Sequence, residues 1–431
     1  MGRSQTNMTG GLSGLTQSTE LRQRIFFVVF ALIVFRLGSF ITLPGIDPSV
    51  MKFLFEQQRG SILDMFNMFS GGSLERMSIF ALGVMPYISA SIIIQMMTHV
   101  YAPLIQLRKE GERGRKKITK YTRYLTTLIA GYYGFLITFF IKPFVFGFNT
   151  SKIIEISLVL TTGSIIIMWI SELITEFGIG NGSSLIIFIN IISSLPDIFK
   201  TIVTSNKSYV LLFLVINIVG IIFVQKSIKI VKIFNLKDLN EVSTEDSYSL
   251  SKEKDYQYGF IPFKLNQSGI FPIIFATTFL TIPINYLTNF SWTKIIPSSI
   301  GNLSYILVYF STILIFNFFY SGLVINTTEL SAELIKMGLV VCDYDTPSKI
   351  IRPGIQTEEY FLGITNRLAI IGGLFLAFVA TLPILIGYFN PDLSVFKNVG
   401  ATSLIIFVSV AFDINRQIRS ELLSEYYKTI I

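Results

Sequence analysis

The chain has 431 residues, of which 51% are apolar and 14% charged, against about 25% charged residues in an average soluble domain. A soluble fold of this length would need more polar surface to cover its core, so the composition excludes an ordinary soluble globular protein. The formal net charge of +8 favours contact with acidic lipid, RNA or an acidic protein, and does not choose among them.

The apolar residues come in runs, and each run has about the 20 residues with which a helix crosses a bilayer. Strands of a membrane barrel would instead alternate apolar and polar residues, and the chain shows no such alternation. The sequence therefore predicts an all-α integral membrane protein with ten transmembrane helices. The predicted spans are 25–43, 77–98, 124–142, 154–174, 184–199, 209–225, 268–288, 303–325, 368–388 and 399–414.

Residues 1–24 are polar and precede a long apolar run without a small-residue cleavage site, so we expect a cytoplasmic N-terminus and a retained first helix. Arg36 is the cation deepest in a predicted span. It either faces an aqueous cavity, or it snorkels or pairs with backbone inside the bundle, and we favour the second interpretation.

A short apolar segment at 64–69 follows the first span and ends at Ser70-Gly71-Gly72. It is too short to cross a membrane, and the glycines give its end conformational freedom. We expect a re-entrant segment that is either a stopper in a cavity or a helix at the outer interface. The second span is expected to begin near Met77 and to bend at Gly83 and Pro86.

Five spans in each half would insert the halves in opposite orientations and place a working site at the bilayer midplane. The predicted halves are 25–205 and 206–415, followed by a cytoplasmic tail at 416–431. Because most lysines and arginines lie in the loops 99–123, 226–266 and 326–367 and in the terminal segments, both termini are expected in the cytoplasm.

The two later cytoplasmic loops have distinct compositions. The first contains an acidic, Ser-rich patch, NEVSTEDSYSLSKEKD, which is typical of weakly structured segments. The second contains TTELSAELIKMG, which predicts a short amphipathic helix, and then Pro353-Gly354, which predicts a turn that displays Arg352.

The sequence contains no HExxH motif, no Gly-rich phosphate loop and no Ser/His/Asp set, so we expect neither an enzyme nor a cofactor. His99 has no second ligand nearby to complete a metal site, and Cys342, expected in a loop, has no intrachain disulfide partner. Amides within spans, Gln95, Asn190, Asn217 and Asn317, are expected to bond between helices. Ion-coupled transporters commonly keep carboxylates at the midplane. Here such groups are scarce, which disfavours the alternative of a secondary solute transporter.

Long stretches of the chain resemble the SecY family, the channel-forming subunit of the Sec protein translocon. The resemblance covers nearly the whole chain in order. It rests on GSILDMFNMFSGGSLERMSIFALGVMPYISASIIIQMMT, RIFFVVFALIVFRLGSFITLPGID, KEGERGRKKITKYTRY, ITEFGIGNGSSLIIF, IIRPGIQTEEY and GATSLIIFVSVAFD.

This resemblance implies a channel that passes unfolded polypeptides across the membrane and releases transmembrane segments laterally into lipid. The fold would be two halves hinged around an hourglass pore, closed by a plug helix at about 62–76. The plug residues implied are Asp64, Met65, Phe66, Asn67, Met68, Phe69, Ser70, Gly71 and Gly72.

The family's pore ring of aliphatic side chains falls on Val84, Ile88, Ser183, Ile187, Ile274 and Ile406. A narrow apolar ring dewets and resists ions. Ser183 departs from the aliphatic pattern, and an alignment shifted by one or two residues would put Leu185 or Ile186 in its place.

The resemblance also implies a lateral gate between spans 2 and 3 and spans 7 and 8, with Gln95 and Thr277 in the seam. The loops 226–266 and 326–367 would bind the ribosome and a SecA-type motor ATPase. The docking residues implied are Arg352, Lys226, Lys229, Lys232 and Lys349.

The other implied partners are SecE-type and SecG-type small membrane subunits, preproteins and membrane lipid. Abundant Ile, Phe, Asn and Lys are typical of an AT-rich genome. We expect the protein in a bacterial plasma (inner) membrane. The alternatives are a plastid thylakoid membrane or a protein encoded by a mitochondrial genome.

Overall fold

The protein is described by a computed structural model in which contacts divide the chain into two compact units. The first unit contains Met1–Leu211 and Gly387–Ile431, and the second contains Leu212–Ile386. The first change of unit lies close to the predicted boundary at residue 205, whereas the last helix belongs to the first unit; the inverted five-and-five arrangement stays a prediction. The structure describes residues 19–46, 51, 67, 69–141, 149–204, 208–235, 259–276, 298–342, 350–389 and 401–430.

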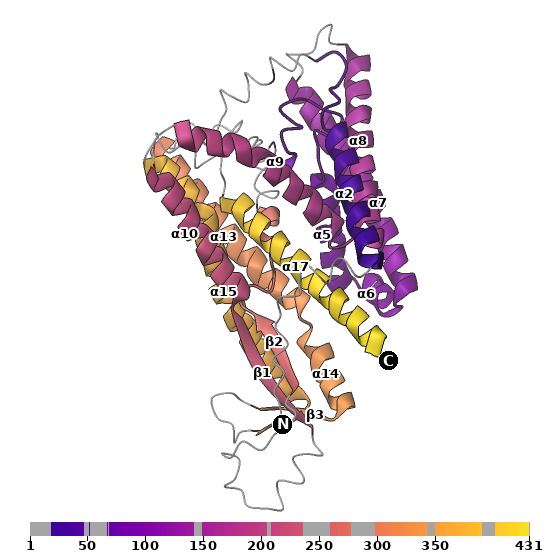
Figure 1. Cartoon of the computed structure of the whole chain (residues 1–431), viewed down its shortest axis with the longest axis vertical. Helices are drawn as coiled ribbons and strands as arrows, with labels where there is room; N and C mark the ends of the chain where they lie inside the picture. Colours follow the sequence, from indigo (N-terminus) through magenta and orange to yellow (C-terminus); the bar gives the residue numbers. More distant parts are fainter. Residues whose placement is uncertain are drawn as a thin grey trace, which may run out of the picture. The chain divides into compact units, whose positions relative to one another are not determined.

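The first unit is helical (Figure 1). Its neighbours α7 and α8 pack side by side, and a Cβ atom added at Gly134 would lie 3.1 Å from the Ser157 carbonyl oxygen, so the two backbones approach closely there. The helices are α2 (Thr19–Gly38), α5 (Met85–Val100), α6 (Ala102–Lys109), α7 (Glu112–Ile141), α8 (Thr150–Phe177), α9 (Gly182–Thr204) and α17 (Ala401–Ile430).

The C-terminal helix α17 joins this unit through two contacts far apart in sequence. The rings of Phe188 on α9 and Phe407 stack with centroids 5.0 Å apart. Arg24 on α2 donates to Glu421 at 3.3 Å. These contacts explain why α17 belongs to the first unit although it ends the chain.

The second unit combines helices with a four-stranded sheet of order β2-β1-β3-β4, in which every neighbouring pair is antiparallel. Lys229 pairs with Phe263, and Ile233 pairs with Val341. The elements are α10 (Ser208–Lys226), which begins in the first unit, β1 (Ile228–Asn235), β2 (Gly259–Lys264), α13 (Ser298–Val324), α14 (Thr327–Met337), β3 (Leu339–Cys342), β4 (Ile350–Ile351) and α15 (Ile355–Phe389).

This sheet is the main departure from the predicted all-α fold. The two loops predicted at 226–266 and 326–367 supply all four of its strands. The predicted helix at TTELSAELIKMG is confirmed as α14, which is capped by Asn326 and Gly338. One face of the sheet packs on α14 and α15 through a core of Val231, Phe263, Leu334, Val341, Ile351 and Phe361. Cys342, predicted in a loop, ends β3. The acidic patch at 240–255 lies outside the described residues.

Each predicted span contains helix, although the seventh is described only to residue 276. Among the residues that the structure describes, three helices are long and apolar enough to cross a bilayer: Ser151–Phe177, Ile306–Met337 and Ile355–Leu382. Counting α5 and α6, which are bent by 95°, as one span would add a fourth. The helical membrane fold is therefore supported by length and composition, and the total of ten spans stays a prediction.

The predicted start of the second span at Met77 is wrong, because the helix begins only at Met85. Residues 70–84 form turns and a bridge to an earlier segment, with the Leu43 amide donating to the Met77 carbonyl at 2.8 Å and the Ile79 amide to the Ile41 carbonyl at 2.9 Å. Gly83 has a φ of 58°, outside the helical range, so the predicted bend is instead the point where the helix starts.

Candidate functional site

A compact segment occupies the place predicted for the end of the plug. Residues 67 and 69 are helical and residues 70–76 have turn conformations, and these described residues are called here the 67–76 turn. The Asn67 carbonyl accepts from the Gly72 amide at 2.8 Å and from the Ser70 hydroxyl at 2.9 Å. The Asn67 side chain accepts from the Glu75 amide at 2.9 Å and donates to the Glu75 carboxylate at 3.0 Å. The turn therefore satisfies much of its own backbone, as a Gly-rich segment can.

Side chains from two helices donate to the backbone of this turn. Asn190 on α9 donates from Nδ2 to the Phe69 carbonyl at 2.8 Å, and Arg36 on α2 donates from Nη1 to the Gly71 carbonyl at 3.1 Å. Gly71 has a φ of 66°, and a Cβ atom added there would lie 2.4 Å from Asn190 Oδ1. Glycine is required at this position by its conformation and by the close approach of the asparagine.

Arg36 is thus paired with backbone, as the favoured interpretation of the sequence predicted. Its guanidinium also lies 5.1 Å from the centre of the Phe40 ring, and the Arg76 guanidinium lies 4.6 Å from that centre. Both guanidiniums are only partly buried and the Phe40 ring is 56% exposed, so each contact contributes about 0.5–1 kcal/mol.

Two of the amides within spans bond between helices, as predicted. Asn190 on α9 donates to the carbonyl of Phe69, a helical residue just before the turn conformations that begin at residue 70. Asn317 on α13 donates from Nδ2 to the Ala369 carbonyl on α15 at 2.7 Å. Composition shows that a buried amide needs a partner, but it does not show which segment supplies that partner.

All six residues predicted for the pore ring are buried. In the first unit, Val84 precedes α5, Ile88 lies within it, Ser183 and Ile187 lie at the start of α9, and Ile406 lies on α17. Ile274 belongs to the second unit and is 4% exposed. The proposed substitutes for Ser183, which are Leu185 and Ile186, are buried as well, so burial does not choose between the alignments and the ring stays a prediction.

The hydroxyl of Ser183 is satisfied beside its own helix start. Its Oγ donates to Asn181 Oδ1 at 2.7 Å, and its amide donates to the same oxygen at 3.1 Å. Asn181 thus caps α9 and engages the serine. A serine whose hydroxyl is bonded in this way makes little demand on a passing chain, which fits a place among aliphatic side chains.

The two residues predicted for the lateral gate have unequal outcomes. Gln95 is an exposed residue of α5, and its carbonyl accepts from the Thr98 hydroxyl at 2.7 Å. Thr277 lies outside the described residues, so the gate stays a prediction.

The His99 ring lies between two other residues at the corner between α5 and α6. Its Nδ1 is 2.9 Å from the Gln95 carbonyl, and its Nε2 is 2.5 Å from Arg108 Nη1.

Arg352 is exposed on a turn that is fastened on both sides. The Arg352 carbonyl accepts from the Thr357 hydroxyl at 2.9 Å, and the Gly354 carbonyl accepts from the Ser331 hydroxyl of α14 at 2.8 Å. Gly354 has a φ of 122°, a conformation that favours glycine. The predicted turn is confirmed, and it ties the arginine to both α14 and α15.

Three of the four lysines predicted for docking lie at the end of α10 and on the sheet. Lys226 ends α10, and Lys229 and Lys232 lie on β1; all three are exposed. Lys349 lies outside the described residues. Their role in docking stays a prediction.

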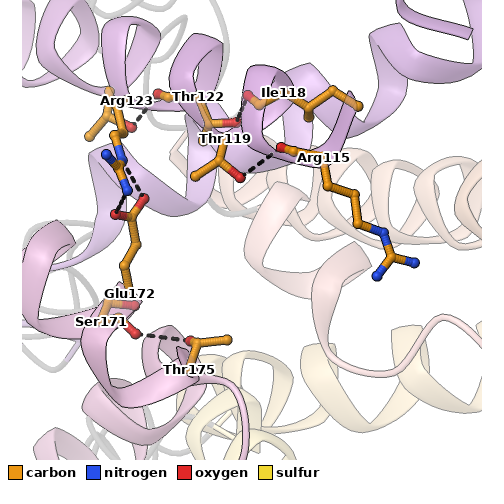
Figure 2. Close-up of polar contacts among 9 residues, drawn as sticks. Arg115, Ile118, Thr119, Thr122, Arg123, Ser171, Glu172 and Thr175 are labelled. Atoms are coloured by element: carbon orange, nitrogen blue, oxygen red, sulfur yellow. Dashed lines mark hydrogen bonds and ion pairs between the residues drawn. The ribbon is translucent and has the colours of Figure 1, made fainter. Parts of the chain in front are cut away.

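An ion pair that the sequence reasoning did not predict joins α7 to α8 (Figure 2). Arg123 Nη2 lies 2.8 Å from Glu172 Oε2, and its Nε donates to Oε1 at 3.2 Å, so both carboxylate oxygens are engaged. The Glu172 side chain is only 14% exposed. Glu172 is therefore neutralised by a fixed partner, unlike a carboxylate that must bind and release an ion.

Threonines near this pair bond back to their own helices (Figure 2). The hydroxyls of Thr119, Thr122 and Thr175 donate to the carbonyls four residues earlier, at 3.0, 3.1 and 2.9 Å. These three hydroxyls are satisfied within their own helices. Over the part of the chain that the structure describes, no group of three or more His, Cys, Asp or Glu residues could hold a metal ion.

Comparison with known proteins agrees with this arrangement. Residues 78–415 match the family model for SecY. The chain is 38% identical over 428 residues to the protein translocase subunit SecY of Guillardia theta, covering 96% of this chain and 97% of that protein. It is also 38% identical over 431 residues to the protein translocase subunit SecY of Escherichia coli strain K12, covering 96% and 94%.

Solved structures show the same fold at low identity. A protein-conducting channel has a TM-score of 0.63 at 15% identity, covering 94% of this chain and 93% of that one. The Sec61 chain of a canine ribosome-channel complex has a TM-score of 0.58 at 16% identity, over 94% and 93% of the two chains. The family match spans well over half of the sequence, and the relatives align from end to end: this chain belongs to the SecY family.

Proposed function

We propose that this chain is the central protein-conducting channel subunit of a Sec translocase. It passes unfolded polypeptides across the membrane and releases transmembrane segments laterally into lipid. The observation that carries the proposal is the end-to-end match, at 38% identity, to relatives named as protein translocase subunits. Such a subunit is not an enzyme, so the energy for transport comes from its partners.

In this proposal a plug and an apolar ring close the resting channel. The plug comprises about residues 62–76, and the 67–76 turn is its seated end. The ring residues are Val84, Ile88, Ser183, Ile187, Ile274 and Ile406. Their burial and the aliphatic character of five of them support the ring, because an apolar constriction excludes water and ions without demanding hydrogen bonds from a passing chain.

The sheet and the Arg352 turn are the proposed docking surface for the partners that drive transport. An exposed arginine on a fixed turn suits carboxylate or phosphate groups on a SecA-type motor or a ribosome. One structural neighbour comes from a ribosome-channel complex, which supports the ribosome as a partner. SecE-type and SecG-type subunits are proposed as the small membrane partners.

The protein is an integral membrane protein with bacterial and plastid relatives. We place it in a bacterial plasma membrane with both termini in the cytoplasm, and a plastid thylakoid membrane is the alternative. A secondary solute transporter is the rival function. The carboxylate of Glu172 on α8 is paired with Arg123, which disfavours a role for Glu172 in ion coupling.

Deleting residues 62–72 tests the plug directly. The complex with its SecE-type partner, reconstituted in a planar bilayer, should conduct ions at rest after the deletion, while the unaltered complex stays closed. The reason is that the deletion removes the stopper and leaves a ring of side chains as the only barrier. A deletion variant that stays as tight as the unaltered complex would contradict the plug assignment.

A further inference from the structure

Side chains from two helices bond the backbone of the 67–76 turn. Asn190 and Arg36, which come from α9 and α2, bond the carbonyls of Phe69 and Gly71, two residues apart in the turn. Side-chain bonds within the turn join Asn67 to Glu75 and Ser70 to Leu74. Leu74 of the turn also packs in a buried cluster with residues of α7 and α8. To move as one piece with its internal bonds kept, the turn must therefore break the bonds to α9 and α2 and lose this packing.

Asn190 is poorly explained as a core residue. Its side chain is fully buried, and among the described residues its Oδ1 has no hydrogen-bond partner. Burying an unpaired polar atom costs free energy, and a leucine of similar size would avoid that cost. The hydrogen bond that Asn190 Nδ2 donates to the Phe69 carbonyl therefore explains why an asparagine occupies this buried position.

The same helix carries a residue of the proposed ring. Ile187 lies three positions before Asn190 on α9, so the two side chains share one face of that helix. A polypeptide that pushed Ile187 outward would move α9 and with it the donor that bonds Phe69. Entry of a chain and release of the turn would then be mechanically coupled.

We propose that Asn190 and Arg36 form a two-point latch that holds the plug closed, and that displacement of α9 at Ile187 opens it. The latch rests on the proposed function, since it requires that the 67–76 turn is the seated end of a plug. It acts on backbone carbonyls, so it would hold the turn independently of the plug's side chains. Arg36 and Asn190 are positioning residues in this scheme and need not touch the transported chain.

Removing either donor should open the resting channel. Asn190→Leu and Arg36→Met each leave a carbonyl of the turn without its donor, which should raise the open fraction at rest about tenfold. The leucine fits a buried apolar site, so Asn190→Leu is expected to fold. The measurement is the resting ion conductance of the reconstituted complex, together with motor-driven transport of a preprotein, which should be retained.

Asn317→Leu is the matched control. It removes a buried amide that also donates to a carbonyl, at 2.7 Å, but its partner is Ala369 in the second unit and not the turn. The latch predicts that this variant stays as closed as the unaltered complex. An equal leak in Asn190→Leu and Asn317→Leu would reduce the effect to general loosening and overturn the latch.

The deletion of residues 62–72 separates the latch from the plug. A conducting deletion variant beside a closed Asn190→Leu variant would overturn the latch and leave the plug in place. A closed deletion variant would overturn the plug and the latch together. A conducting deletion variant, a leaky Asn190→Leu variant and a closed Asn317→Leu variant are the results that the latch predicts.

Discussion

At the scale of single residues, buried polar groups mark the places where this membrane protein departs from a simple apolar bundle. Asn190 bonds a turn, Asn317 bonds a neighbouring helix, and Arg36 bonds a carbonyl while lying near an aromatic ring. In lipid each such group needs a partner inside the protein. Their partners therefore fix local geometry that hydrophobic packing alone would leave open.

The pair between Arg123 and Glu172 permits a test of how such a group affects stability. Arg123→Ala leaves a carboxylate that is 14% exposed without its cation, and the guanidinium was itself about half exposed. We expect a loss of about 1–2 kcal/mol in the free energy of unfolding, because solvent screens part of the pair's interaction. The check is a lower melting temperature of the detergent-solubilised complex.

The matched control is the exposed pair of Lys117 and Glu110, whose nitrogen and oxygen lie 3.4 Å apart. Both partners are about half exposed, so Lys117→Ala should change the melting temperature little. Equal losses in the two variants would show that burial of Glu172 adds nothing to the pair.

At the scale of elements, helices were easier to predict than the structure between them. Runs of about 20 apolar residues locate most helices, since a membrane imposes a length on them. The sheet was missed although IKIVKIFN alternates in part, because its partner strands lie far away in the sequence, with Lys232 opposite Cys342. The start of α5 was misplaced because residues 77–84 are apolar like a helix but have turn conformations, including Met77 at a φ of 46°.

The candidate site could be predicted only in part for the same reason. The Gly-rich segment and the exposed Arg352 turn are local features that a sequence shows. The seat of the 67–76 turn depends on Asn190, which lies 121 residues from the carbonyl that it bonds. No rule of sequence spacing links positions so far apart, so this contact could be identified only from the structure.

The Arg352 turn carries a prediction at this scale. Arg352→Glu should impair motor-driven export severely, because it reverses the charge on a turn held by Thr357 and Ser331, while the fold keeps its hydrogen bonds. The assay is ATP-driven transport of a preprotein into vesicles, with the amount of inserted channel measured in parallel.

Arg367→Glu is the control for charge in the same loop, since Arg367 is exposed on α15 and lies outside the turn. It should transport nearly as well as the unaltered protein. Normal export by Arg352→Glu would remove this residue from the docking surface, and equal defects in the two variants would indicate a general effect of charge.

At the scale of the whole molecule, the chain combines a helical membrane fold with a four-stranded sheet and a turn that bonds two helices. Membership of the SecY family links these parts to protein transport. In the proposal, the ring and plug close the channel and the docking turn binds the partners. In the proposed function the ring and plug hold back ions while the channel rests, and the partners supply the energy. The central claim is that polypeptides pass along the ring residues.

The most direct test is to arrest a preprotein partway through the reconstituted complex and to map its contacts with photo-crosslinkers. Probes at Val84, Ile187 and Ile406 should crosslink to the arrested chain, because these buried side chains would line its path. A probe at Leu158, an apolar side chain that is 61% exposed on α8, should crosslink to lipid instead. Crosslinks to the preprotein at Leu158 and none at the three ring positions would contradict the account.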